Sequence, residues 1–102
     1  MPNSLNTEFT ITPNPLEGTK YTSKVLQQMK PNLKTGYTDF HGFLEIVDNY
    51  AGLGSRQYIT GRDNIERIKI SLDGAYRGIE GNFEWLIEPD MSINHRLFVP
   101  NP

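Results

Sequence analysis

The sequence has no cysteine among its 102 residues, which excludes a disulfide framework and a thiolate metal site. It also contains no apolar run of the length that a membrane span needs. The segment Met1-Pro2-Asn3 starts a polar stretch, so we expect no signal peptide. The formal net charge is only −2, and binding of nucleic acid would therefore need a local basic patch.

The apolar and aromatic residues that the sequence contains are sufficient for the core of one small domain. The hydrophobic fraction is 36%, and one Trp, five Tyr and five Phe can supply large buried areas. Residues 1–18 are polar and proline-containing, which indicates an arm or linker, with a disordered tail as the alternative. We interpret residues 19–102 as a single domain.

Apolar residues at four-residue spacing predict a first helix over residues 19–29. Either Thr19 or Thr22 can cap its beginning, and Pro31 prevents it from continuing far. Residues 32–36 are expected to form a turn. Because a helix this short is not stable alone, its apolar side must pack on something larger, and the downstream sheet is the available partner.

A second short helix is predicted over residues 43–50, where apolar side chains recur at helical spacing. Alternation of apolar and polar side chains then predicts strands at residues 56–60, 65–72, 82–87 and 92–99. Two helices followed by about four strands indicate an α+β fold. We therefore expect short N-terminal helices packed on a roughly four-stranded antiparallel meander sheet.

The stretch from Asp73 to Pro100 is predicted to form a hairpin preceded by a loop at residues 75–81. Its pairing register decides which face each side chain occupies. If Trp85 faces His95, one face is apolar and Glu84 lies opposite Arg96. If Glu84 faces His95, both faces are mixed and a carboxylate lies beside an imidazole. The sequence leaves both registers open.

Two histidines, His41 and His95, are the residues whose unperturbed pKa lies near neutrality. As a general acid and a general base, they could promote attack of an RNA 2′-hydroxyl on its own phosphate. Arg77 lies between glycines, where its guanidinium could contact phosphate. The ordinary alternatives are a sheet histidine, a histidine at a helix start and a solvated arginine.

Other charged side chains could complete such a site. Arg96 could neutralise phosphate or pair with Glu84, and Glu84 could be a general base or only that ion-pair partner. The strand with Arg67 and Lys69 could add a basic edge, although a solvated strand face is the more ordinary account. Tyr76 could stack on a base or belong to the core. A metal site is disfavoured, because no HxxxH or DxD cluster accompanies the histidines.

The chain resembles the C-terminal toxin domains of bacterial polymorphic toxins, the effectors of contact-dependent inhibition and Rhs systems. The blocks that carry this resemblance are Asp39-Phe40-His41-Gly42-Phe43, Ile46-Val47-Asp48-Asn49-Tyr50, Gly74-Ala75-Tyr76-Arg77-Gly78, Gly81-Asn82-Phe83-Glu84-Trp85 and Ile93-Asn94-His95-Arg96-Leu97-Phe98. The group is similar to the barnase, EndoU, colicin and RelE-like ribonucleases.

The resemblance implies N-terminal helices followed by a four-stranded antiparallel sheet, and metal-independent cleavage of RNA, with tRNA a frequent target. It implies no cofactor, and places His41, Arg77 and His95 at the active site, with Glu84 and Arg96 as further candidates. A cognate immunity protein would be the partner. Such a domain is delivered within a secreted effector and acts in the target-cell cytoplasm; expressed alone, it would be cytoplasmic.

The first functional hypothesis is therefore an endoribonuclease toxin domain. A non-catalytic protein-binding module, immunity-like or adaptor-like, is the alternative, and the mildly acidic composition favours it because inhibitors of nucleases are commonly acidic. A DNase on the same scaffold is weaker, because the expected cluster of metal-binding carboxylates is missing. Toxicity on expression would separate the toxin from the binding module.

Overall fold

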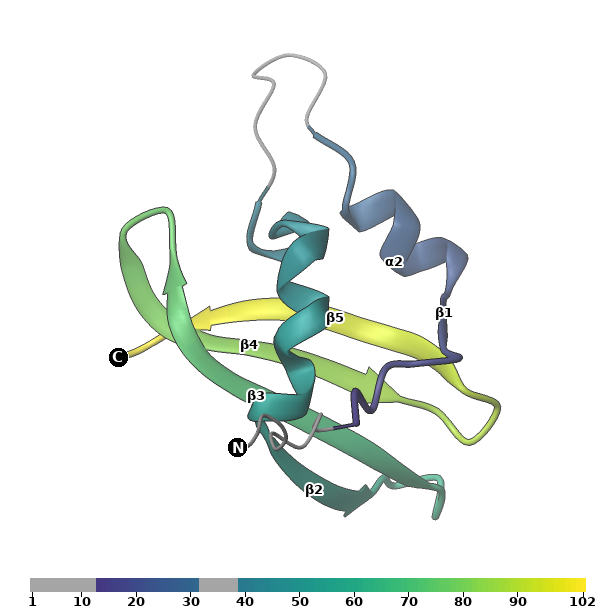
Figure 1. The fold of residues 1–102 in the computed structure, drawn as a ribbon. Helices are drawn as coiled ribbons and strands as arrows, with labels where there is room; N and C mark the ends of the chain where they lie inside the picture. The colour runs from purple at the N-terminus through teal and green to yellow at the C-terminus, as the bar shows by residue number, and fades with distance from the viewer. Residues whose placement is uncertain (1–12, 32–38) are drawn as a thin grey trace, which may run out of the picture.

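The computed structural model describes residues 13–31 and 39–102. It is an α+β domain built on a five-stranded mixed sheet, with the strand order β1-β5-β4-β3-β2 (Figure 1). The elements are β1 (Lys20–Tyr21), α2 (Ser23–Gln28), the 3-10 helices η1 (Phe40–Gly42) and η2 (Glu45–Leu53), β2 (Ser55–Thr60), β3 (Glu66–Tyr76), β4 (Ile79–Ile87) and β5 (Ser92–Pro100). None of the described helices is long and apolar enough to cross a membrane.

The additional strand is β1, which was predicted as part of the first helix. The Thr22 hydroxyl accepts a hydrogen bond from the Val25 amide at 3.3 Å, so the helix begins only at Ser23. The two residues before this cap pair in parallel with the first two residues of β5. The sheet is thus mixed rather than a four-stranded meander. The turn predicted at residues 32–36 lies outside the described residues.

The second helix is a 3-10 helix rather than an α-helix. Three residues per turn align Glu45, Asp48 and Ala51 along one side, and Asp48 and Ala51 are buried. Ile46 and Tyr50, which the α-helical pattern assigned to the packed side, are exposed instead. The tighter helical period therefore places a carboxylate beside Ala51, on the side of the helix that faces the sheet.

Strands β3 and β4 extend beyond the predicted 65–72 and 82–87 and form a hairpin with each other. Tyr76 pairs with Ile79, which leaves Arg77 and Gly78 as a two-residue turn. Both have positive φ, 56° and 80°, as a type I′ turn requires. The loop predicted at residues 75–81 is therefore wrong, because strand pairing continues to the tip.

The register between β4 and β5 is neither of the two predicted. Trp85 pairs with Arg96 and Leu86 pairs with His95, and the register shifts between Leu86 and the next residue of β4. Asn94 is the extra residue of this β-bulge. Arg96 consequently shares a face with Trp85, whereas His95 projects from the other side of the sheet.

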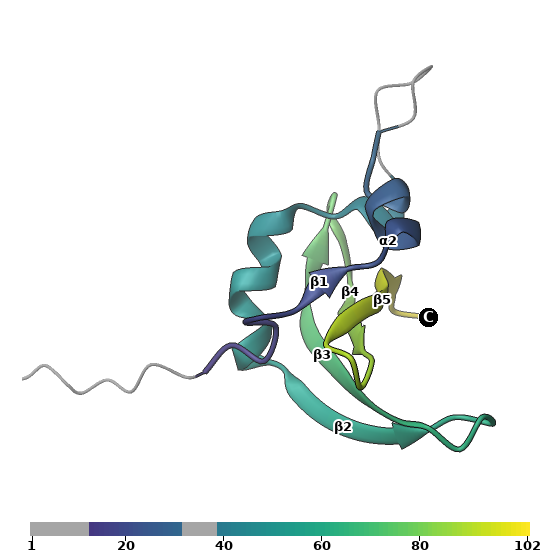
Figure 2. The same ribbon diagram turned by 90° about the vertical axis from the view of Figure 1, so that its right-hand side faces the viewer.

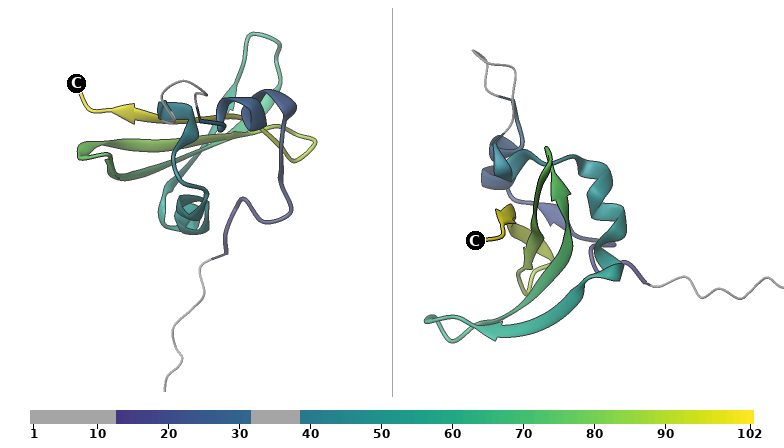
Figure 3. Two further views of the ribbon diagram at one scale, coloured as in Figure 1. Left: turned by 90° about the horizontal axis from the view of Figure 1, so that it is seen from above. Right: turned by 90° about the vertical axis from the view of Figure 1, so that its left-hand side faces the viewer.

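The two faces of the sheet differ in what packs against them. The packed face carries most of the core against η2; its buried side chains include Ile70, Phe83, Trp85, Ile87, Arg96 and Phe98. The opposite side, which we call the open face, carries the partly exposed Lys69, Glu84, Leu86 and His95. Figures 2 and 3 show the β2–β3 end of the sheet curving away from η2, with α2 beyond the β5 edge. The open face is thereby concave.

Candidate functional site

Arg96 is fully buried and connects the helical segments to the sheet. Its Nη2 and Nε donate to Asp48 Oδ1 at 2.9 and 3.3 Å. Its Nη1 donates to the His41 carbonyl, and Nη2 also to the Leu44 carbonyl, each at 3.2 Å. The Phe43 ring lies 3.6 Å from Cζ. The predicted pairing of Arg96 with a β4 glutamate is wrong, because Arg96 points to the packed face and its guanidinium is enclosed.

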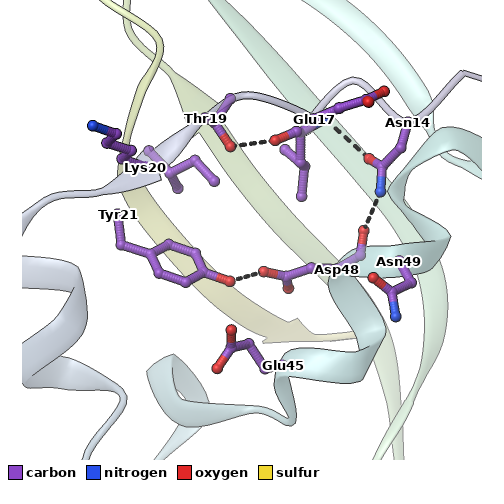
Figure 4. A pocket seen from close by; sticks show the side chains of 10 residues that line it. Asn14, Glu17, Thr19, Lys20, Tyr21, Glu45, Asp48 and Asn49 are labelled. Atoms are coloured by element: carbon purple, nitrogen blue, oxygen red, sulfur yellow. Dashed lines mark hydrogen bonds between the residues drawn. The ribbon is translucent and has the colours of Figure 1, made fainter.

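Asp48 is the partner that sequence reasoning missed. Its Oδ1 also accepts from Trp85 Nε1 at 3.0 Å, and its Oδ2 accepts from the Tyr21 hydroxyl (Figure 4). Burial, followed by this hydrogen bond and the Asp48 charge, raises the pKa of Tyr21. No local pattern marks this carboxylate, because Glu45 and Asn49 of the same helix are polar as well. Asp48 lies at a cavity of about 450 Å³, but its oxygens are occupied by these donors.

His41 lies in η1, away from His95. Asp39 caps this helix by accepting from the His41 amide at 2.8 Å, and its Oδ1 lies 3.3 Å from His41 Nδ1. Phe40 of the same turn packs edge-on against Phe98 of the packed face, with ring centroids 5.7 Å apart. The two predicted catalytic histidines therefore belong to opposite sides of the sheet, and the structure does not bring them together.

Arg77 and Tyr76 lie at the tip of the β3–β4 hairpin. The Tyr76 hydroxyl donates to the Gly42 carbonyl at 3.5 Å, and its ring packs against neighbouring aromatic rings of the packed face. Arg77 Cζ lies 5.9 Å from the centre of that ring. Five residues of β4 separate the turn from Glu84, a span of about 20 Å at the rise of a β-strand. Arg77 and Tyr76 thus lie far from Glu84.

A cluster of three predicted residues does form on the open face. His95 Nε2 lies 3.5 Å from Glu84 Oε1, and Lys69 Nζ lies 3.5 Å from Glu84 Oε2. The side chains of His95, Lys69 and Glu84 are 37%, 32% and 17% exposed. Lys69 comes from β3, Glu84 from β4 and His95 from β5. Leu86 of β4 pairs with Lys69 on one side and with His95 on the other. Glu84, two residues before Leu86 on the same face, reaches both side chains diagonally.

This open-face cluster lines a cavity of about 310 Å³. The other lining residues are Lys24 from α2, Ile59 from β2, Leu86 and Asn94. Two larger cavities lie elsewhere, one beside Asp48 and one of about 510 Å³ at the far end of β3 and β4. Neither combines an imidazole, a carboxylate and an ammonium group, so the smaller cavity is the candidate site.

Arg67 belongs to the open face but is held by two carboxylates. Its Nε donates to Glu88 at 2.8 Å and its Nη2 to Asp63 at 2.7 Å. The hydrogen bond from Arg67, followed by that from the Ile65 amide, lowers the pKa of Asp63 to about 2. Because β3 lies between β2 and β4, Arg67 and Lys69 do not form the predicted basic edge. Lys69 alone of the two reaches the cluster.

The open-face cluster holds the parts that acid–base chemistry on a phosphate requires. A carboxylate can accept a proton, an imidazolium can donate one, and a nearby ammonium can balance negative charge. Their partial exposure leaves room for a ligand, in contrast to the enclosed Arg96.

Comparison of the chain with family models, with curated proteins and with solved structures gives no match. Among the residues that the structure describes, no three His, Cys, Asp or Glu side chains are grouped so as to hold a metal ion. Function must therefore be inferred from the chemistry of the open-face cluster.

Proposed function

We propose that this domain is an endoribonuclease that cleaves RNA by attack of a 2′-hydroxyl on the adjacent phosphate, without a metal ion. The observation that carries the proposal is the contact of Glu84 with both His95 and Lys69, at 3.5 Å each, in a partly exposed cavity. The reacting pair is Glu84 and His95, in place of the two histidines expected from the sequence.

In this reaction Glu84 accepts the proton of the 2′-hydroxyl as its oxygen forms a bond to phosphorus. The bond from phosphorus to the 5′-oxygen breaks, and His95, in its protonated form, donates a proton to that leaving oxygen. Lys69 stabilises the negative charge that develops on the phosphate oxygens. The products are a 2′,3′-cyclic phosphate and a 5′-hydroxyl. For these proton transfers the histidine must begin protonated and the glutamate ionised.

The curvature of the sheet supports a chain-like substrate. The sheet curves away from η2 at its β2–β3 end (Figures 2 and 3), and Lys24 of α2 and Ile59 of β2 both line the cavity on the open face. Lys24 and Lys69 supply positive charge at the cavity from different elements. Such a local patch can attract a phosphate backbone although the whole chain carries a formal charge of −2.

The test is cleavage of a labelled RNA oligonucleotide in buffer with EDTA, compared with the same buffer containing Mg²⁺. We expect equal rates and a 2′,3′-cyclic phosphate end identified by mass spectrometry, and no cleavage of DNA of the same sequence, which lacks the attacking hydroxyl. His95→Ala and Glu84→Gln should each lower the rate by about 10²- to 10⁴-fold, the usual contribution of a general acid or base.

Glu80→Gln is the matched control for Glu84→Gln, because Glu80 lies on the same strand and face, beyond the cavity. It should cleave at the wild-type rate. Thermal unfolding of all variants separates loss of chemistry from loss of fold. An inactive wild-type protein, or a His95→Ala protein that cleaves normally, would overturn the proposed site.

The proposal extends to a toxin domain with an immunity partner, and the sequence resemblance supports this part. Induced expression in bacteria should then arrest growth, whereas the His95→Ala variant should not. Co-expression of a protein that restores growth while the domain remains present would identify the partner. Growth unaffected by an RNA-cleaving wild-type domain would contradict the toxin role alone.

One observation favours a protein-binding module as the second candidate function. Strand β2 forms an edge of the described sheet, and all six of its residues are exposed, including Tyr58 at 60%. An exposed edge can pair with a strand of another protein. A binding module would keep its cellular effect in the His95→Ala and Glu84→Gln variants, and would lose it on replacement of Tyr58 by a charged residue.

A further inference from the structure

The bulge in β5 places one additional residue, Asn94, on the open face. In a regular strand, neighbouring side chains point to opposite faces. At the bulge, Ile93 and Arg96 are both buried on the packed face, and the two residues between them, Asn94 and His95, both line the open-face cavity. A carboxamide is thereby placed directly beside the imidazole proposed as the general acid.

Asn94 is held in a defined orientation. Its Nδ2 lies 3.5 Å from Glu88 Oε2, and Glu88 is itself fixed by Arg67 at 2.8 Å. Since an ionised carboxylate only accepts hydrogen bonds, the amide nitrogen is the atom that faces Glu88. Asn94 keeps a second N–H donor and a carbonyl acceptor after this contact, because a carboxamide has two donors and an acceptor.

We propose that Asn94 reads the nucleobase next to the scissile phosphate and selects adenine. An adjacent donor and acceptor on a carboxamide match the N7 acceptor and the N6 donor of adenine as a bidentate pair. Glu88 and Arg67 act as positioning residues that set this orientation. The inference rests on the proposed function, since it assigns the specificity of the same cavity.

The first measurement is binding, which does not require cleavage. We would titrate 2′-deoxy tetranucleotides, in which each position in turn is A, G, C or T, into the ¹⁵N-labelled domain and follow the Asn94 side-chain amide by NMR. One position should favour adenine by about 10-fold, the equivalent of one good bidentate pair. The second measurement is the cleavage rate of RNA tetranucleotides with the same substitutions, with U in place of T, which should show the same preference.

Two variants and a control sharpen the test. Asn94→Ala should abolish the preference for adenine. Asn94→Asp replaces the donor by an acceptor and should move the preference toward cytosine, whose N4 amino group donates. The control is Asn82→Ala. Asn82 lies on β4, on the same open face of the sheet as Asn94 but outside the cavity, so its replacement should leave the preference unchanged.

The outcomes separate the two proposals. Cleavage without any preference among the four bases would overturn the role of Asn94 and leave the nuclease function standing. A preference for adenine in binding, lost in Asn94→Ala but unaccompanied by cleavage, would support the role of Asn94 in recognition and overturn the nuclease function. A preference that persists in Asn94→Ala would assign recognition to another residue and overturn the inference.

Discussion

The two faces of the sheet each carry a group of charged side chains, and the two groups differ in what surrounds them. On the packed face, Arg96 and Asp48 are buried and their donors and acceptors are occupied by Trp85, Tyr21 and backbone carbonyls. On the open face, Glu84, His95 and Lys69 are partly exposed and meet at 3.5 Å. The first arrangement holds the fold, and the second is available to a ligand.

Residue type alone does not decide whether a charged side chain stabilises the fold or remains available to a ligand. Arg96 and His95 are neighbours in the sequence, and both were expected at the active site. The bulge and the alternation of β5 send them to opposite faces. Solvent screens the open-face ion pairs, so they add little to stability, whereas removal of one partner from the buried pair leaves an uncompensated charge.

The largest effect should come from breaking the packed-face pair. Arg96→Met removes the charge but keeps much of the volume, and leaves Asp48 buried with fewer donors. We expect the free energy of unfolding to fall by about 3–5 kcal/mol, as for other broken buried pairs, measured by urea denaturation. His95→Ala, at the adjacent position on the open face, is the matched control and should lower the free energy of unfolding much less.

If Arg96→Met does not fold, the double variant Asp48→Asn/Arg96→Met tests the same point, because it removes the uncompensated charge and should recover part of the stability. A loss for His95→Ala as large as that for Arg96→Met would contradict the contrast between the faces.

A smaller effect is expected at Tyr21. Tyr21→Phe removes its hydrogen bond to Asp48 and should cost about 1 kcal/mol at neutral pH. Because burial raises the pKa of Tyr21, the folded state binds its proton more tightly than the unfolded chain, in which tyrosine ionises at about pH 10. This stability is fully present below about pH 10 and is lost as the pH rises above that value.

The difference in unfolding free energy between wild type and Tyr21→Phe should therefore shrink at alkaline pH. Tyr58→Phe is the control, since Tyr58 is exposed on the edge strand and should show no such change between neutral and alkaline pH. An unchanging difference for Tyr21→Phe would mean that its hydroxyl is not held by Asp48.

The smallest effect is expected at His41. Its side chain pairs with Asp39, and its element packs on the side of the sheet opposite the open-face cluster. His41→Ala should leave the rate of RNA cleavage within about 3-fold of wild type, because it removes neither the general base nor the general acid of the proposed reaction. A loss comparable to that of His95→Ala would restore the two-histidine hypothesis and reject the Glu84–His95 pair.

Local patterns predicted much of the fold. The alternation around Trp85 indicated β4, and Pro31 limited the end of α2, because these signals depend on residues close in sequence. Thr22, which caps α2, was one of the two caps that the sequence left open. Parallel β1 was missed, since a two-residue strand has no period to detect and exists through its pairing with β5. The 3-10 form of η2 was missed as well, because its apolar residues also fit an α-helical spacing.

The candidate site was predictable in part. Glu84, Lys69 and His95 were each named from the sequence. The contact of Glu84 with His95 arises diagonally across the strands, in a register that is neither of the two alternatives left open. Asp48 was missed, because nothing in a local pattern shows that a carboxylate will meet a buried arginine from a distant strand.

By itself, then, the sequence determined which segments alternate as strands, that a short helix ends before Pro31, and which side chains can carry acid–base chemistry. These follow from local backbone preferences and from the chemistry of each side chain. The tertiary structure alone decided that Arg96 is buried and that His95 meets Glu84 and Lys69. The reason is the one-residue bulge at Asn94, together with the pairing of distant strands, which sets the face of every side chain in β5.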